Sequence, residues 1–503
     1  MVRDTIELGQ DGRKTLSGHP RGLRTLFFTE LWERFSYYGM RALLVLFMVA
    51  PVESGGLGFS ATEAAIVYGN YTMAVYMLSI PGGFIADRLL GATGAVLFGG
   101  LIIAAGHFTL ALPSVAAFYT GLILVALGTG LFKPSISALV GALYRQGDER
   151  RDAGFSIFYM GINIGAFLAP LVTGFLAQGA PFKAWLSAAG LDPTTSWHYG
   201  FAAAGVGMVL GLSIFIAQAG YFRTLTSQGS EQKGGEEVTP SWRATALLII
   251  ATLILGSLLF LSDREGWTWL RGLILALPLL AFGWFVTRPD VESRRIAAIL
   301  VFFMAAVVFW AIFEQAGLTI ALFADQLTRT EVLGYAFPSA WFQSLNPIFV
   351  ILLAPLFAAL WMRWGERQPS SPVKFAAGLF FLALSFLLMV PAALLTIEGR
   401  VSPLWLVGLF FLQTVGELLL SPVGLSTMTK LAPVRATGLV LGVWFLASAF
   451  GNKLASILGA GFTSSDPEGL SRFFLHQGLT VAAVALLLLM AAPFVRRLMG
   501  GIR

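Results

Sequence analysis

Several ionisable side chains lie inside stretches that are otherwise apolar, and their types indicate what chemistry this chain could perform. They are Glu30, Glu33 and Arg34 in residues 24–50, Lys133 in 115–143, Glu314 in 296–325, and Glu417 in 403–430. Carboxylates can take up and release protons, while Arg and Lys can bind an anionic group. A charge near the bilayer centre costs roughly 2.5–3.5 kcal/mol, so such residues are functional candidates. The alternative is a buried ion pair that only fixes helix packing.

Helical spacing places several of these side chains on shared polar stripes. The first stripe has the spacing i, i+4, i+7 and i+11 and consists of Glu30, Arg34, Tyr37 and Arg41. Two later runs have i, i+4 pairs, Trp310 with Glu314 and Glu417 with Ser421. Residues at these spacings lie on one face of a helix. One polar stripe in an apolar background is typical of a helix that lines a water-filled path.

The composition predicts the environment of these helices. Of 503 residues, 56% are hydrophobic and 12% are charged, with a mean hydropathy of +0.77. A soluble domain carries about 25% charged residues, so the chain is predicted to be a membrane protein. The net charge of +6 comes from basic residues that are not gathered on a soluble segment, which argues against nucleic acid as a partner.

The residues that are missing narrow the function classes. The chain has no cysteine, which excludes disulfides, thiolate nucleophiles and thiolate metal sites. It contains no GxSxG, HExxH or P-loop pattern. A membrane-embedded hydrolase or an ATP-driven pump is therefore a poor interpretation, and we expect neither enzymatic activity, nor a bound metal, nor a cofactor.

Apolar runs of about 20 residues predict fourteen membrane-spanning helices. Their ranges are 24–50, 60–85, 93–112, 115–143, 154–178, 198–220, 243–261, 266–287, 296–325, 338–362, 373–397, 403–430, 436–461 and 473–495. We expect an N-terminal tail over 1–23, a six-helix bundle over 24–220, a linker over 221–242, an inserted helix pair over 243–287, and a second six-helix bundle over 296–498. Two six-helix halves joined by a linker are the architecture of the all-α major facilitator fold.

The basic residues predict the orientation of these helices. If the N-terminus is cytoplasmic, 23 Lys and Arg residues fall in the termini and loops on that side, and seven fall on the other side. This asymmetry follows the positive-inside rule. We therefore expect both termini and the linker to be cytoplasmic, in the inner membrane of a bacterial-type cell.

Pseudo-symmetry between the two halves predicts ion pairs that form and break during transport. The fourth helices of the halves carry Lys133 and Glu417, and the first helices carry Arg34 and Glu314. Lys133 and Glu417 are expected to pair towards the cytoplasmic exit.

A second pair is expected towards the outside. Arg41 and Asp325 lie at the extracellular ends of the two first helices, 7 residues after Arg34 and 11 after Glu314. At about 1.5 Å per residue, both are more than one turn away from those charges. We expect them to pair when the outer side is closed.

The motifs around these residues resemble one family. They are ExxERFSYYGMR at 30–41, GGFIADRLLG at 82–91, GTGLFKPSISALVGALYRQGDERRDAGFSIFYMGINIG at 128–165, WAIFEQAG at 310–317, QSLNPIFVILLAP at 343–355 and GELLLSPVGLSTMTKLAP at 416–433. Together they resemble the proton-dependent oligopeptide transporters of the major facilitator superfamily, in their bacterial form. That form has a helix pair inserted between its halves.

The resemblance implies symport of di- and tripeptides with protons by a chain that works as a monomer. It implies that Glu30, Glu33 and Arg34, together with Glu417, couple transport to protons. It further implies that the peptide site comprises Arg34, Tyr37, Tyr38, Tyr76, Lys133, Asn163, Trp310, Glu314, Asn346, Glu417 and Ser421.

The side-chain chemistry suits a zwitterionic peptide. Arg34 and Lys133 could bind its carboxylate, and Glu314 or Glu417 its ammonium group. Two alternatives of the same fold stay open. A drug/proton antiporter would not need fixed charges for both peptide ends, and a carrier of nitrate-like anions would not need Glu314. The sequence assigns neither a partner to Lys453 nor a role to the inserted pair.

Overall fold

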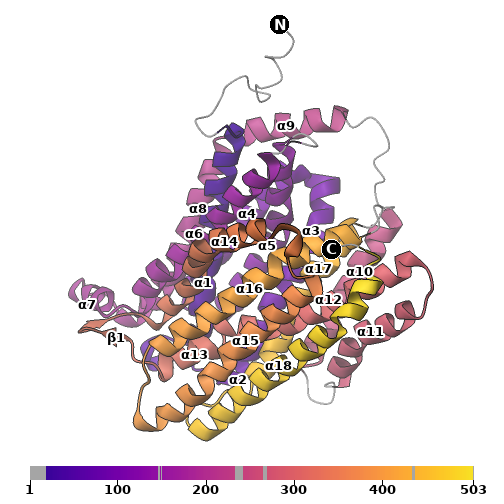
Figure 1. Cartoon of the computed structure of the whole chain (residues 1–503). Coiled ribbons are helices and arrows are strands. Elements are labelled where there is room, and N and C mark those ends of the chain that lie inside the picture. Colours follow the sequence, from indigo (N-terminus) through magenta and orange to yellow (C-terminus); the bar gives the residue numbers. More distant parts are fainter. Residues whose placement is uncertain are drawn as a thin grey trace. The chain divides into compact units, whose positions relative to one another are not determined.

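The computed structural model describes residues 18–144, 148, 150–232, 242–263, 269–432 and 437–501, which are mostly helical (Figure 1). Each of the fourteen predicted ranges coincides with helical structure. In the described residues, nine helical stretches are long and apolar enough to cross a membrane by length and composition. The remaining predicted spans coincide with α1 (Arg21–Val49), α10 (Trp242–Leu261), α11 (Trp269–Val286) and α17 (Thr437–Gly459). The count of fourteen spans stays a prediction.

The chain forms two compact units, and the first consists of residues 1–40, 78–173 and 198–239. It contains the first two-thirds of α1, together with α3 (Ser79–Ile85), η2 (Ala86–Leu90), α4 (Gly91–Leu110), α5 (Val115–Ala142), most of α6 (Arg150–Gln178), α8 (Ser196–Ile216) and α9 (Ala219–Gln232). Its core contains Leu26, Phe132, Ile136, Met208 and Phe215, all buried. These side chains come from α1, α5 and α8, so apolar packing holds α1 in place.

The second unit consists of residues 41–77, 174–197 and 240–503. Its first-half elements are the end of α1, η1 (Val52–Ser54), α2 (Ala61–Met77), the end of α6, α7 (Ala180–Ala188) and η3 (Pro193–Thr195). Its later elements are α10, α11, α12 (Val291–Phe313), η4 (Glu314–Gly317), α13 (Thr319–Gln326), β1 (Glu331–Val332), β2 (Tyr335–Ala336), η5 (Ser339–Ser344), α14 (Leu345–Trp364), η6 (Gly365–Arg367), α15 (Ser371–Leu395), η7 (Thr396–Glu398), α16 (Leu404–Leu431), α17 and α18 (Pro467–Leu498).

Aromatic side chains hold the helices of the second unit together. The rings of Phe302 on α12 and Phe375 on α15 are 4.8 Å apart, and Phe386 on α15 and Phe474 on α18 are 5.7 Å apart. Helix α15 lies beside both α16 and α18 (Figure 1). Edge-on aromatic pairs of this kind add to the stabilisation from apolar burial. The same unit packs α2 against α17 and α11 against α12.

Three local features differ from the sequence predictions. Part of the predicted linker 221–242 is helical, because α9 extends to Gln232; residues 233–241 lie outside the described part. A short antiparallel hairpin pairs Glu331 with Ala336, and α7 forms a helix between two predicted spans. The compact units also cut across the predicted six-helix bundles, since the first unit ends at Met40 within α1. The predicted division into bundles stays a prediction.

The predicted span 296–325 is interrupted at its centre. Helix α12 ends at Phe313, η4 follows, and α13 begins at Thr319 after Leu318 at φ −125° and ψ −94°. Side chains bind polar groups at this break: the amide of Gln343 donates to the carbonyl of Ala316, and the hydroxyl of Thr319 donates to the Gln315 side chain. Buried backbone carbonyls that lose their helical partner need such donors. The interruption places Glu314 at a helix end.

Candidate substrate and proton site

The first unit gathers three charged side chains on α1 in a buried cluster. The guanidinium of Arg34 pairs with the carboxylate of Glu33, and its Nε lies 3.1 Å from Oε1 of Glu30. The three side chains are exposed by only 6%, 1% and 4% for Arg34, Glu33 and Glu30. One cation thus faces two anions in a buried setting, where charges are stable only when paired and hydrogen-bonded.

The cluster keeps unused hydrogen-bonding atoms. Oε2 of Glu30, Oε1 of Glu33 and Nη2 of Arg34 are buried and have no hydrogen-bond partner among the described residues. Buried polar atoms without partners are rare in proteins and call for an explanation. The free guanidinium nitrogen can donate to an anion, and the two free oxygens can accept a proton. The cluster therefore provides both a donor for a carboxylate ligand and acceptors for a proton.

The first unit also contains the predicted site residues Tyr37, Tyr38, Lys133 and Asn163. The guanidinium of Arg34 lies 5.3 Å from the ring centre of Tyr37, whose ring meets that of Tyr38 edge-on. Lys133 on α5 interacts electrostatically with Glu30. Asn163 on α6 is buried, and its amide donates to the carbonyl of Tyr159 at 3.0 Å. Lys133 therefore lies within electrostatic reach of the α1 cluster.

A close approach of α6 holds the charged face of α1 in place. A methyl group at Gly165 would lie 2.2 Å from the carbonyl oxygen of Leu31 and 3.1 Å from Cβ of Arg34. We expect Gly165→Ala to push α1 and α6 apart and to destabilise the fold by about 1–3 kcal/mol. Thermal unfolding in detergent should show a lower Tm. The control is Gly220→Ala, which adds the same methyl where no atom lies within 4 Å; an equal Tm for the two variants would contradict this account.

The second unit holds a polar group around Glu417 on α16. The amide of Asn346 on α14 donates to Oε2 of Glu417 at 2.9 Å and to the hydroxyl of Thr414 at 3.0 Å. Ser421 follows one helical turn later. Glu314 also acts electrostatically on Glu417, so two carboxylates lie near each other in this unit. Such a pair can bind a cationic group or a proton.

The remaining predicted site residues of this unit are aromatic. Trp310 lies on α12, one turn before Glu314, and its indole nitrogen is buried without a hydrogen-bond partner among the described residues. Its ring meets those of Phe309 and Phe313 edge-on, which fixes its orientation. Tyr76 lies in the last turn of α2. Trp310 therefore offers an unused donor next to an acidic side chain.

Arg41 binds a different carboxylate from the one predicted. Its guanidinium pairs with Glu314, which is 3% exposed, and its Nε donates to the Tyr68 hydroxyl at 2.6 Å. Asp325 instead accepts hydrogen bonds from Ser339 at 2.6 Å and Gln178 at 3.2 Å. Glu314 continues the helical course of α12 at φ −70° and ψ −10°, whereas Asp325 follows the non-helical turn at Leu318, so the interruption changes the position of Asp325. The pairing of Arg41 with Asp325 when the outer side is closed stays a prediction.

These contacts do not test the predicted ion pair between Lys133 and Glu417 towards the cytoplasmic exit. Lys133 lies in the first unit and Glu417 in the second, as do Arg34 and Glu314 respectively, so both interhalf pairs stay predictions. Thr414 and Tyr68 were not among the predicted site residues, although they contact the groups around Glu417 and Arg41. Thr414 could have been identified from spacing, since it lies three residues before Glu417 on the same helix. Tyr68 lies on another helix from Arg41, so spacing could not reveal it.

The fold and the two charged groups are those of a helical multi-pass membrane transporter, and comparison with known proteins gives the family. The POT family profile matches residues 93–468, and the chain belongs to this family. It is 41% identical to an uncharacterized transporter, YclF, of Bacillus subtilis, with 97% of each chain covered. It is 36% identical to a di-/tripeptide transporter of Lactococcus lactis subsp. cremoris, covering 97% of this chain and 98% of that one.

A solved relative confirms the fold. The crystal structure of a peptide transporter POT in complex with alafosfalin superposes with a TM-score of 0.82 at 42% identity, and 99% of each chain is covered. The predicted major facilitator fold is thus confirmed, and the family and its relatives are transporters rather than enzymes.

Proposed function

We propose that this chain is a symporter that brings di- and tripeptides into the cell together with protons, by alternating access across the inner membrane. We also propose that both termini are cytoplasmic and that the monomer is the functional unit. The observation that carries the proposal is the buried α1 cluster, where Arg34 keeps a free donor nitrogen and two glutamates keep free oxygens. Family membership and the di-/tripeptide transporter of L. lactis support the substrate class.

The proposed peptide site uses charges of both signs. Arg34 and Lys133 would bind the peptide carboxylate, while Glu314 or Glu417 would bind the ammonium group. Asn163 and Asn346 would reach the peptide amide, and Tyr37, Tyr38, Tyr76, Trp310 and Ser421 would line the remaining surface. Since Arg41 already pairs with Glu314, the ammonium group and Arg41 would compete for this carboxylate. A carrier of small anions would gain nothing from the carboxylates of the second unit, which favours a zwitterionic substrate.

The test is uptake of radiolabelled dialanine into proteoliposomes. We expect accumulation above the outside concentration when the outside is acidic, and its collapse when a protonophore removes the gradient. Unlabelled di- and tripeptides should compete, while free alanine and nitrate should not. Uptake that ignores the proton gradient would contradict symport, and competition by nitrate alone would favour the anion carrier.

A further inference from the structure

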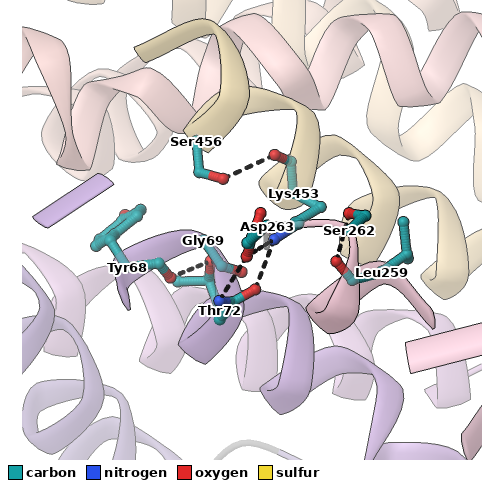
Figure 2. A network of polar contacts seen from close by, with 9 residues as sticks. Tyr68, Gly69, Thr72, Leu259, Ser262, Asp263, Lys453 and Ser456 are labelled. Carbon is teal, nitrogen blue, oxygen red and sulfur yellow. Dashed lines mark hydrogen bonds and ion pairs between the residues drawn. The ribbon is translucent and has the colours of Figure 1, made fainter. Parts of the chain in front are cut away.

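Lys453 lies inside α17 with a side chain that is only 2% exposed, and it takes part in a charged triad. Its ammonium group pairs with the carboxylate of Asp263 and donates to Oδ1 of Asn70 at 2.7 Å. The amide nitrogen of Asn70 donates in turn to Oδ2 of Asp263 at 2.9 Å. Figure 2 shows Lys453 and Asp263 facing each other between their helices. The triad thus joins α17, α2 and the inserted pair.

Local structure fixes each member of the triad. Asp263 follows the end of α10, where the Ser262 hydroxyl donates to the Leu259 carbonyl at 2.6 Å (Figure 2). The Asp263 amide donates to the Phe260 carbonyl at 3.2 Å. Asn70 lies on α2 and Lys453 on α17. These bonds close the last turn of α10 and hold Asp263 at its end, so its position depends on the inserted pair.

Helices α2 and α17 approach each other closely beside the triad. A methyl group at Gly69 would lie 2.2 Å from Cβ and Oγ of Ser456, so the absence of a side chain at residue 69 permits this contact. The Ser456 hydroxyl donates to the carbonyl of Lys453 at 2.8 Å, as Figure 2 shows. Ser456 is 3% exposed and covered by α2. Its accessibility therefore reports whether α2 lies against α17.

The charges within the triad determine which helix can separate from the others. The carboxylate that pairs with Lys453 comes from the inserted pair, and Asn70 of α2 accepts from Lys453 through a neutral amide. Removing one partner of a buried ion pair is strongly unfavourable, whereas losing hydrogen bonds to a neutral amide costs less. Helix α2 can therefore separate from α17 without leaving the ammonium group unpaired, provided that Asp263 stays with α17.

We propose that Lys453 and Asp263 form a lasting ion pair against which Asn70 closes, so that the inserted pair supplies the counter-ion of the α2–α17 contact. Asp263 and Lys453 are thus positioning residues for the closure of α2 against α17. This inference rests on the proposed alternating-access function, because it assigns the separation of α2 from α17 to that cycle. It gives the inserted pair a role in transport that composition and spacing did not reveal.

The test uses a single cysteine in this cysteine-free chain. Ser456→Cys serves as the parent, and the rate at which a polar maleimide labels the purified protein in lipid nanodiscs measures how often α2 leaves α17. Asp263→Asn in this parent removes the carboxylate that pairs with the buried ammonium group, so opening to water should become more favourable. We expect labelling to accelerate about tenfold or more. The double variant Asp263→Asn with Lys453→Gln removes both charges and should return labelling towards the parent rate.

A charge-preserving exchange decides between this proposal and a purely structural role. Asp263→Asn combined with Asn70→Asp moves the carboxylate onto α2, so separation of α2 would now break the ion pair. We expect labelling slower than that of the parent, the opposite of the single Asp263→Asn change. If this exchange accelerated labelling, or if all folded variants labelled at the parent rate, the proposal would be overturned. Because the exchange keeps an ion pair, it decides the matter even where Asp263→Asn fails to fold.

The labelling assay needs neither peptide nor proton gradient, so it separates two kinds of failure. A parent protein that transports no dipeptide but shows the expected order of labelling rates would contradict the proposed function and retain the closure role of the triad. If the parent shows normal proton-driven uptake but all folded variants label at the parent rate, the proposed function is supported and the closure role of the triad is contradicted.

Discussion

Glu30→Gln or Glu33→Gln should abolish proton-driven accumulation of dipeptides while exchange of peptide at equal pH continues. Both glutamates lie against Arg34 and are almost fully buried, and each keeps one oxygen without a partner among the described residues. Glutamine has nearly the same shape and can still accept a hydrogen bond, but it cannot take up a proton at this position. The variant should therefore keep the binding site and lose the coupled ion.

The physical reason is competition for one guanidinium group. When a peptide carboxylate engages Arg34, the neighbouring glutamates share their counter-ion and bind a proton more readily. Protonation of a glutamate in turn frees Arg34 for the peptide. Binding of the two ligands must be mutually favourable, because thermodynamic linkage is reciprocal.

Counterflow and gradient-driven uptake in the same proteoliposomes separate the two activities. The control is Glu63→Gln, which alters an exposed glutamate at the start of α2 that accepts hydrogen bonds from Ser60. That variant should retain both activities. Folded Glu30→Gln and Glu33→Gln proteins that lose both activities equally, or keep both, would show that the cluster only stabilises helix packing.

The helices were predictable from sequence because a bilayer demands long apolar segments with internally satisfied backbone groups. The predicted range 24–50 and the observed α1 at Arg21–Val49 differ by only a few residues at each end. Spacing on one helix was equally informative, since the Glu30–Arg34 contact follows from i, i+4 geometry. The resemblance to the oligopeptide transporters, drawn from motifs spread along the chain, is confirmed by the family match.

Contacts between helices were less accessible to sequence reasoning. The interruption after Phe313 contains no proline, and Gln343 from a distant element donates to the Ala316 carbonyl there. The pairing of Arg41 with Glu314 joins two helices far apart in the sequence, so spacing along one helix could not indicate it. The partner of Lys453 lies in a loop between two predicted spans, where neither periodicity nor hydropathy marks Asp263. Such partners depend on tertiary packing rather than on local pattern.

Blocking either end of a dipeptide should weaken its binding by two orders of magnitude or more. In the proposed site Arg34 offers its free nitrogen to the peptide carboxylate, and Glu314 or Glu417 meets the ammonium group. Leaving a buried charged group without its partner costs about 3 kcal/mol, which is more than 100-fold in affinity. Changing a peptide side chain should have a smaller effect, because the site would bind groups that every peptide shares.

Competition against labelled dialanine should therefore rank free dialanine well above N-acetyl-dialanine and dialanine amide. Arg34→Ala supplies the decisive comparison, because it should weaken binding of the free acid and leave that of the amide nearly unchanged. The preference for a free carboxylate should then fall sharply, with Lys133 retaining part of it, while the preference for a free amino group remains. Glu314→Gln or Glu417→Gln should instead weaken binding of free dialanine and leave that of N-acetyl-dialanine nearly unchanged. The variant that no longer distinguishes these two ligands identifies the carboxylate that binds the ammonium group. Equal competition by blocked and free dipeptides in the unaltered protein would refute recognition of the two charged ends.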